Sequence, residues 1–167
     1  MGETREPEGL NAEQLAAYFA LMEVSSLLRH AVEGQLREEG GISYVQFEIL
    51  AHLVDAPSGR QRMTDLADGI VYSRSGLTYQ AGRLEEAGLI AREPSAADER
   101  STTVAITAAG RELVARVIPG HVQLVRRILL EPLDRRDTAV LTDLLQRIRD
   151  RMRAAPPRSA APRPRRT

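Results

Sequence analysis

The order of helix and strand signals in residues 60–107 constrains the fold more than any other feature of the chain. Apolar spacing predicts a short helix capped by Thr64, followed by an amphipathic helix over 74–87 capped by Ser73. Two strands follow, joined by a long polar turn over 94–101. We expect these strands over 89–93 and 102–106. A short helix, a capped helix and a hairpin in this order are the parts of a winged helix-turn-helix.

Long helical segments flank this module. Before it, apolar residues at helical spacing predict a helix over 12–39, and Ser43 with Gln46 forms a capping box for a second helix. After it, Thr107 caps a long segment in which Pro119 predicts a kink or two abutting helices. The sequence therefore predicts a mainly α fold with a small β-hairpin wing, and long N- and C-terminal helices around it.

The last helix carries a regular apolar seam. It is predicted to begin near Asp134 or Asp137, and its apolar residues recur at +4, +3 and +4. These residues are Leu141, Leu145, Ile148 and Met152. Such a seam and the wide apolar face of 12–39 are too apolar for water, so we expect a homodimer.

The expected organisation is one domain between two polar ends. A flexible arm is expected over 1–11, and 155–167, with four Pro and no apolar residue larger than Ala, reads as a disordered Arg/Pro-rich tail. Within the domain, 12–154, the helix-turn-helix is expected over 60–88, the wing over 89–107, and dimerisation helices over 12–39 and 107–154.

Composition excludes several classes of protein. The absence of cysteine rules out disulfides, thiol-based redox sensing and cysteine-ligated metal sites. The three histidines have no metal-ligand spacing, so we expect neither a metal nor a cofactor. No nucleotide-binding, serine-hydrolase or zinc-protease motif occurs, which argues against an enzyme. With no membrane-length apolar run and no signal sequence, a cytoplasmic protein without a membrane partner is expected.

The net charge of zero conceals an uneven distribution. Residues 147–167 hold eight arginines against one acid, which leaves 15 arginines against 22 acids in 1–146. Binding to nucleic acid must therefore depend on a local patch. The window 69–84 contains two arginines and no acid, and its hydroxyls can donate to phosphates or base edges. We expect DNA contacts from Ser73, Arg74, Ser75, Thr78, Tyr79 and Arg83; the alternative is an ordinary solvated helix face.

Four segments in this order resemble the MarR family of bacterial transcription regulators. Residues 84–90, LEEAGLI, resemble the family's L-E-x-x-G-L-I junction between recognition helix and wing. Residues 98–107 resemble the wing pattern of D-x-R, five residues, an aliphatic residue and T. Residues 63–67 and 73–75 resemble the helix-turn-helix, and the whole resemblance covers roughly 12–152.

The resemblance implies a homodimeric, ligand-responsive repressor that binds a palindromic operator in double-stranded DNA. It places 74–87 in the major groove and Arg100 in the minor groove, with Asp98 orienting the guanidinium. The alternative for this pair is an exposed ion pair contributing under about 1 kcal/mol. Because Glu93 and Glu99 oppose phosphate binding, a dimeric protein-interaction module is the alternative function.

Many members of that family sense small phenolic or other aromatic molecules between the dimer helices and the DNA-binding lobe. The resemblance therefore implies a possible effector site, in which an arginine near aromatic side chains would hold a carboxylate. Candidate residues are Tyr18, Met22, Arg29, Phe47 and His52. The alternative is that Met22 and Phe47, at helical spacing, are ordinary core residues.

Overall fold

The computed structural model describes residues 9–70, 72–95 and 98–154, and the side chains of 94–101 lie outside that description. The expected tail over 155–167 and most of the expected arm over 1–11 therefore also fall outside it. In chain order the elements are α1 (Ala12–Gly40), α2 (Tyr44–Asp55), β1 (Arg60–Arg62), α3 (Met63–Ile70), α4 (Arg74–Glu86), β2 (Ile90–Ser95), β3 (Asp98–Ile106), α5 (Ala108–Val125), a π-helical turn η1 (Arg126–Leu130) and α6 (Arg135–Arg153).

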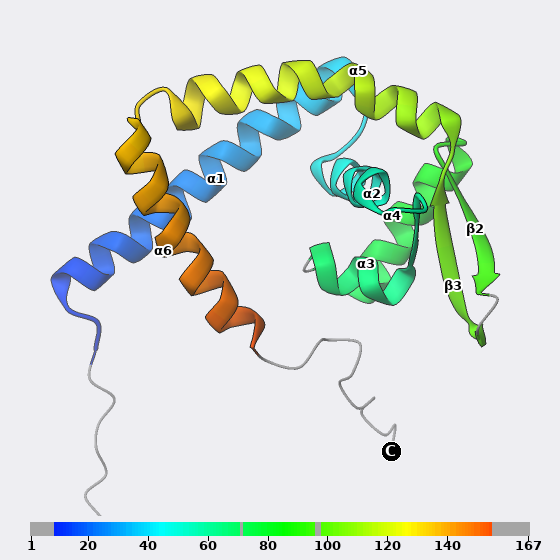
Figure 1. The fold of residues 1–167 in the computed structure, drawn as a ribbon, viewed down its shortest axis with the longest axis horizontal. Helices are drawn as coiled ribbons and strands as arrows, with labels where there is room; N and C mark the ends of the chain where they lie inside the picture. Colours follow the sequence, from blue (N-terminus) through cyan, green and yellow to red (C-terminus); the bar gives the residue numbers. More distant parts are fainter. Residues whose placement is uncertain (1–8, 71, 96–97, 155–167) are drawn as a thin grey trace, which may run out of the picture.

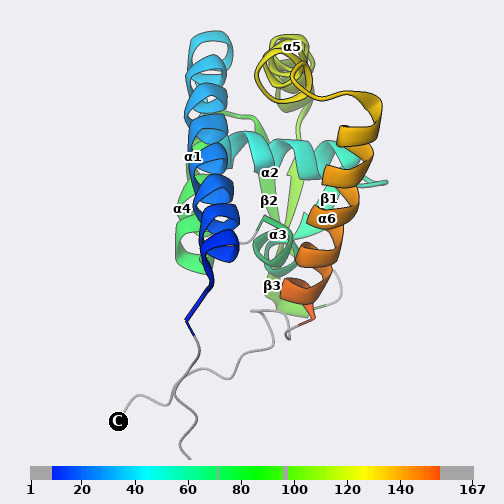
Figure 2. The same ribbon diagram turned by 90° about the vertical axis from the view of Figure 1, so that its left-hand side faces the viewer.

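These elements form an arch (Figure 1). Helix α1 packs along α5 at the top, and a lobe made of α2, α3, α4 and the small sheet lies beneath one end. Helix α6 descends from the other end and lies in front of the lobe in the turned view of Figure 2; Arg153 at its end donates a hydrogen bond to the backbone carbonyl of Gly69 of α3. The prediction of a mainly α fold with a winged helix-turn-helix between long terminal helices is confirmed.

Local capping signals position most of the helix starts. The Oγ of Ser43 accepts a hydrogen bond from the backbone N–H of Gln46, whose side chain accepts one in return, which completes the predicted capping box. Thr107 caps α5 as predicted. Of the two starts considered for the last helix, Asp134 is the cap, in a box with Asp137.

One buried apolar core holds the lobe against the long helices. It joins α1, α2, both helices of the helix-turn-helix, the sheet and α5. Its most deeply buried large side chains are Leu36, Ile49, Leu50, Leu53, Leu66, Leu77, Leu84, Val104 and Val117. Burial of this set fixes α4 on the lobe. Within the described ranges, no helix is long and apolar enough to cross a bilayer.

The sheet differs from the prediction in two ways. It has three strands in the order β1-β3-β2, and β1 pairs antiparallel with β3 with Gln61 opposite Val104. The sequence did not predict β1, because its residues Arg-Gln-Arg lack the apolar alternation of a strand. The hairpin strands also continue to Ser95 and from Asp98, so the expected long turn is wrong.

One expectation for the helices fails, and one of two alternatives is excluded. Helix α3 begins at Met63, so Thr64 lies inside its first turn and does not cap it. At Pro119, α5 runs on as one helix, which excludes the alternative of two abutting helices; the alternative of a kink stays a prediction. This helix packs closely on α1, since a Cβ added at Gly40 would lie 2.8 Å from Cγ1 of Val117. The π-helical turn that follows α5 has no signal in the sequence that we recognised.

Candidate nucleic-acid interface

Helix α4 has a buried side and a polar exposed side. Leu77, Ala81 and Leu84 are buried in the core, as the sequence predicts. On the opposite side Tyr79 is 65% exposed. Ser73 caps the helix by accepting a hydrogen bond from the backbone N–H of Gly76 at 3.2 Å. The helix therefore begins at a fixed point and presents its polar side to solvent.

The predicted DNA-contacting residues of this helix are all exposed. Thr78 donates its hydroxyl to the backbone carbonyl of Arg74 at 2.8 Å, and its side chain still faces solvent. Arg83 forms an exposed ion pair with Glu86, 3.1 Å between Nη1 and Oε2. Contact between Arg83 and a phosphate would have to displace that carboxylate. The helix brings together six candidates: Ser73, Arg74, Ser75, Thr78, Tyr79 and Arg83.

The wing residues that the sequence singled out lie at the free end of the hairpin. Asp98 is the first residue of β3 and pairs with Ser95 of β2. The side chains of Asp98 and Arg100 lie outside the described residues, as does that of Glu99. Their proposed roles therefore remain predictions.

An ion pair that the sequence analysis missed joins α4 to the wing. Glu85 of α4 accepts hydrogen bonds from the backbone N–H of Arg92, at 3.0 Å, and from its Nε, at 2.7 Å. The Arg92 side chain is the main cause that lowers the pKa of Glu85, and the backbone hydrogen bond adds to it. Two contacts to one carboxylate limit how α4 and β2 can move relative to each other.

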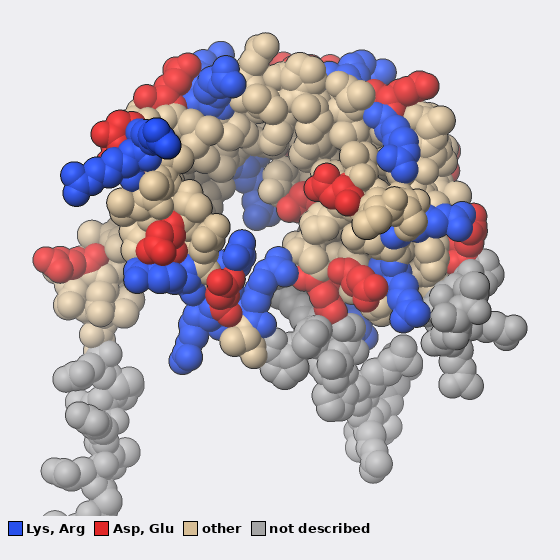
Figure 3. All heavy atoms as spheres, viewed as in Figure 1, with Lys and Arg blue, Asp and Glu red and all other residues tan. Residues whose placement is uncertain are grey.

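A further ion pair of the lobe connects the two outer strands of the sheet. Glu93 of β2, expected to oppose phosphate binding, forms an ion pair with Arg60 of β1 at 3.0 Å. Because β3 lies between these two strands, the pair bridges the whole sheet. Figure 3 shows acidic and basic side chains interspersed over this part of the molecule.

A cavity of about 300 Å³ lies between α1, α2 and α5. It is lined by Ser25, Leu28, Arg29, Val32, Tyr44, His121 and Val125. The Arg29 guanidinium lies 5.5 Å from the centroid of the Tyr44 ring, which suits a cation–π contact. A larger groove of about 670 Å³ lies elsewhere between α1 and α5, but its lining is mostly polar and contains no aromatic ring apart from His30.

Of the five residues predicted to bind an effector, one lines this cavity and four lie elsewhere. Arg29 lines it, and Met22 borders an open hollow on α1 that Arg29 also borders. Phe47 is buried behind the cavity, with its ring 5.0 Å from that of His121. Tyr18 is exposed on α1, and His52 packs against Gly69 of α3. Sequence reasoning missed Tyr44 and His121.

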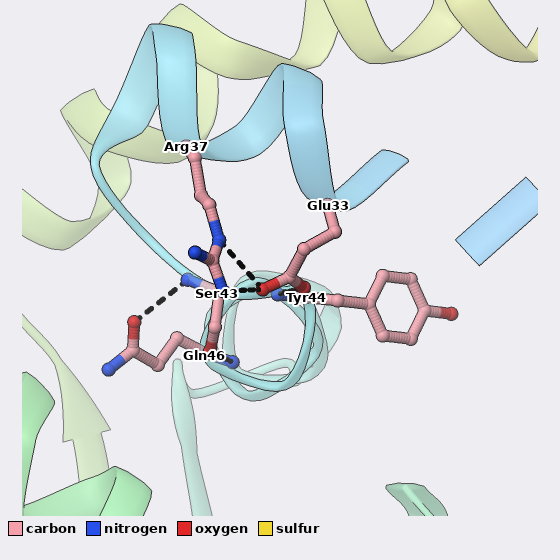
Figure 4. A network of polar contacts seen from close by, with 5 residues as sticks. All are labelled: Glu33, Arg37, Ser43, Tyr44 and Gln46. Carbon is pink, nitrogen blue, oxygen red and sulfur yellow. Dashed lines mark hydrogen bonds and ion pairs between the residues drawn. The ribbon is translucent and has the colours of Figure 1, made fainter. Parts of the chain in front are cut away.

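Polar contacts hold the cavity walls in place. Glu33 of α1 accepts hydrogen bonds from the backbone N–H of Tyr44, at 2.6 Å, and from Arg37, at 2.8 Å (Figure 4). Burial alone would raise the pKa of Glu33, but these hydrogen bonds, together with the positive charges of Arg37 and Arg29, outweigh burial and lower the pKa. Burial raises the pKa of Glu48, beside Tyr44, and lowers that of His121. The His121 imidazole and the Arg29 guanidinium thus face the same cavity.

Comparison with known proteins gives one consistent result. Residues 40–101 match the model of the MarR family. The transcriptional regulator PecS of Dickeya dadantii is 30% identical over 83% of each chain. Among solved structures, the MarR family regulator Sco3205 of Streptomyces coelicolor, in complex with DNA, is 30% identical, with a TM-score of 0.82 over 88% of this chain and 92% of that one. AbsC from the same organism is 33% identical, with a TM-score of 0.81 over 88% and 99%.

Proposed function

Since the chain belongs to the MarR family of transcriptional regulators, which are not enzymes, we propose that it acts as a homodimeric, ligand-responsive repressor on a palindromic operator in double-stranded DNA. Each part of this proposal has its own support in the described residues. Recognition depends on α4, dimerisation on apolar surfaces of the long helices, and ligand response on the cavity at Arg29.

The two-sided character of α4 carries the DNA-binding part of the proposal. A helix anchored by Leu77 and Leu84, with hydroxyls and two arginines on its exposed side, fits a major groove about 12 Å wide. Its first turn contains no acid, so the positive end of the helix dipole is available to phosphate. The proposed contacts come from Ser73, Arg74, Ser75, Thr78, Tyr79 and Arg83 on α4, and from Asp98 and Arg100 in the wing.

Exposed apolar side chains on α1 and α6 support the homodimer. Helix α6 has no buried residue within the described chain, although it carries the apolar seam that its sequence predicts. The exposed apolar side chains include Leu21, Val24 and Leu27 on α1 and Leu144, Leu145, Ile148 and Met152 on α6. A second copy would remove this surface from water. Because a two-fold dimer presents two identical α4 helices, its operator should be a palindrome.

The cavity at Arg29 supports a small anionic aromatic effector. Its volume lies at the lower end of the usual range for ligand sites, and its lining combines apolar side chains with one arginine. Arg29 can bind a carboxylate while the Tyr44 ring stacks beside it. A dimer bound over a promoter would block transcription and so act as a repressor. An effector that binds in the cavity and moves α1 away from α2 would change the spacing of the two α4 helices in the dimer.

Binding at low salt tests this function directly. We expect the full-length protein to bind random duplex DNA more tightly than single-stranded RNA of equal length. Tyr79→Ala should weaken binding to the selected sites. The control Gln123→Ala, which changes an exposed neutral side chain on α5, should leave that binding unchanged. Equal affinity for duplex DNA and RNA, or no binding to either, would contradict the proposal and favour a protein-interaction module. Titration with 4-hydroxybenzoate tests the effector site: Arg29→Gln should abolish any shift in DNA affinity that the wild type shows.

A further inference from the structure

Among the described residues, Arg62 of β1 is an arginine of the lobe without an acidic partner. Three other arginines of the lobe, Arg60, Arg83 and Arg92, each form an ion pair with a glutamate. Arg62 is exposed, and within the described part of the chain it forms no ion pair or hydrogen bond through its side chain. An exposed guanidinium whose charge is not compensated attracts anions. Arg62 is therefore available to a ligand that carries negative charge.

The pairing of the strands explains why Arg62 has no carboxylate beside it. The outer face of the sheet is the face opposite to the buried side chain of Val104. On this face Arg62 of β1, Thr103 of β3 and Glu93 of β2 share one row across the sheet. Both carboxylate oxygens of Glu93, however, accept hydrogen bonds from Nη2 of Arg60, at 3.0 and 3.1 Å. The described side chains of the outer face thus include two arginines and one acid, and the uncompensated charge lies at Arg62.

A hydroxyl lies next to this guanidinium. Directly opposed residues of an antiparallel pair have Cβ atoms roughly 5 Å apart on the same face, and Thr103 is opposite Arg62. Within the described ranges the Thr103 hydroxyl has no hydrogen-bond partner. Arginine and threonine side chains are common donors to the phosphate oxygens of DNA. The pair can therefore donate hydrogen bonds to one phosphate group.

The row of Arg62 and Thr103 lies between the free end of the wing and the helix-turn-helix. Arg62 is followed directly by α3, and the hairpin points away from α5 in Figure 1. Thr103 is five residues from Asp98 at the free end, which corresponds to about 17 Å along the strand. A minor groove is about 7.5 Å deep, so a wing that enters it leaves this row about 10 Å from the phosphates at the edge of the groove. An extended arginine side chain and one hydrogen bond can span that distance.

We propose that Arg62 and Thr103 form a phosphate-binding site on the outer face of the sheet, which contacts the DNA backbone at the edge of the minor groove that the wing enters. The inference rests on the proposed binding of duplex DNA by this chain. It adds a contact outside α4 and outside the free end of the wing. Because a phosphate contact carries no sequence information, the site should increase the affinity for every duplex alike.

Two variants of the site and a matched control test this. Arg62→Gln removes the charge, Thr103→Val removes only the hydroxyl, and the control Arg116→Gln removes an equal charge from an exposed residue of α5. Anisotropy titrations of the full-length protein use an operator duplex and a scrambled duplex between about 50 and 200 mM salt. Arg62→Gln should flatten the slope of log affinity against log salt by about 0.9 unit for each protomer bound. Its affinity should fall roughly fivefold for both duplexes, with their ratio changed less than about twofold.

Thr103→Val should keep the wild-type slope, because it removes no charge, and should lower the affinity about two- to fivefold. The control should keep both the wild-type slope and the wild-type affinity. An unchanged slope in Arg62→Gln, or an equal loss in the control, would overturn the inference. Wild-type affinity in Thr103→Val would also overturn the site, because Arg62 would then act only as a charge at a distance.

Failure of the proposed function gives a different result from failure of this site. If the chain does not bind duplex DNA, the wild type itself binds neither duplex at low salt, and both claims are overturned together. A wild type that binds the operator, with Arg62→Gln indistinguishable from it, overturns only the site at Arg62 and Thr103.

Discussion

The carboxylate of Glu85, in the last turn of α4, accepts hydrogen bonds from both the backbone N–H and the side-chain Nε of Arg92 in β2. This relationship ties the helix proposed for the major groove to the strand that leads into the wing. Both side chains are about one-third exposed, so the pair adds little to the stability of the fold. We propose that it fixes the angle between the two elements that are proposed to contact DNA.

Replacing Glu85 with Ala should therefore weaken operator binding roughly fivefold with little change in melting temperature. The loss should come from the wing, so protection of the minor groove in a hydroxyl-radical footprint should fade before protection of the major groove. Glu86→Ala is the matched control, because it removes an equal charge one residue away and frees Arg83. We expect it to leave operator binding equal or tighter. An equal loss in both variants would show that the angle of the wing is not the cause.

The residues of α4 should differ in whether they contact phosphates or bases. Arg83→Ala should weaken binding to all duplexes alike and flatten the salt slope by about one unit, because a phosphate contact carries no sequence information. Ser75→Ala or Tyr79→Ala should instead relax the preference at a particular base pair. Salt titrations and selection profiles of the three variants check this. Wild-type affinity and specificity in all of them would remove α4 from the DNA interface.

Glu33 should support the joint between α1 and α2. Glu33→Ala leaves the backbone N–H of Tyr44 without its acceptor and should lower the free energy of unfolding by about 1–2 kcal/mol. Because folding lowers the pKa of Glu33, its contribution is complete above the ordinary value of 4.5 and is lost as the pH falls below it. Chemical denaturation at several pH values should show a flatter acid dependence in the variant. Glu38→Ala, exposed on the same helix, is the control and should behave as the wild type.

The wing arginine gives a prediction about flanking sequence. Arg100→Ala should weaken operator binding by about 1–3 kcal/mol, most strongly where A·T-rich flanks narrow the minor groove. Asp98→Ala should cost less, because it removes only the group proposed to orient the guanidinium. Neither change should destabilise the fold by more than roughly 1 kcal/mol. Wild-type affinity together with a destabilised fold in Arg100→Ala would make Arg100 a structural residue.

Features set by neighbours in the chain could be predicted from the sequence. The caps at Ser43, Ser73 and Thr107 depend on hydrogen bonds to residues three positions away, and the burial of Leu77 and Leu84 follows from helical periodicity. A local pattern is sufficient for both. The resemblance of residues 84–90 and 98–107 to MarR family motifs then predicted the order of the helix-turn-helix, the wing and the long helices around them.

Features set by distant partners could not be predicted in this way. The strand β1 exists because Gln61 pairs with Val104, more than forty residues away, and its own residues carry no strand signal. The cavity joins Arg29, Tyr44 and His121 from three helices, and a helical pattern in one segment does not reveal which segments will face it. For the same reason the approach of Arg153 to Gly69 has no signature in either segment.

Selection of bound sequences from a random duplex library with the full-length protein tests the central claim most directly. The account predicts enrichment of one two-fold palindrome whose half-site centres lie about 10 bp apart, because two identical α4 helices would enter successive major grooves. Sedimentation of the selected complex should show two chains, each of 18.4 kDa, on one duplex. Enrichment of an asymmetric site, binding as a monomer, or a pool that remains random after selection would contradict it.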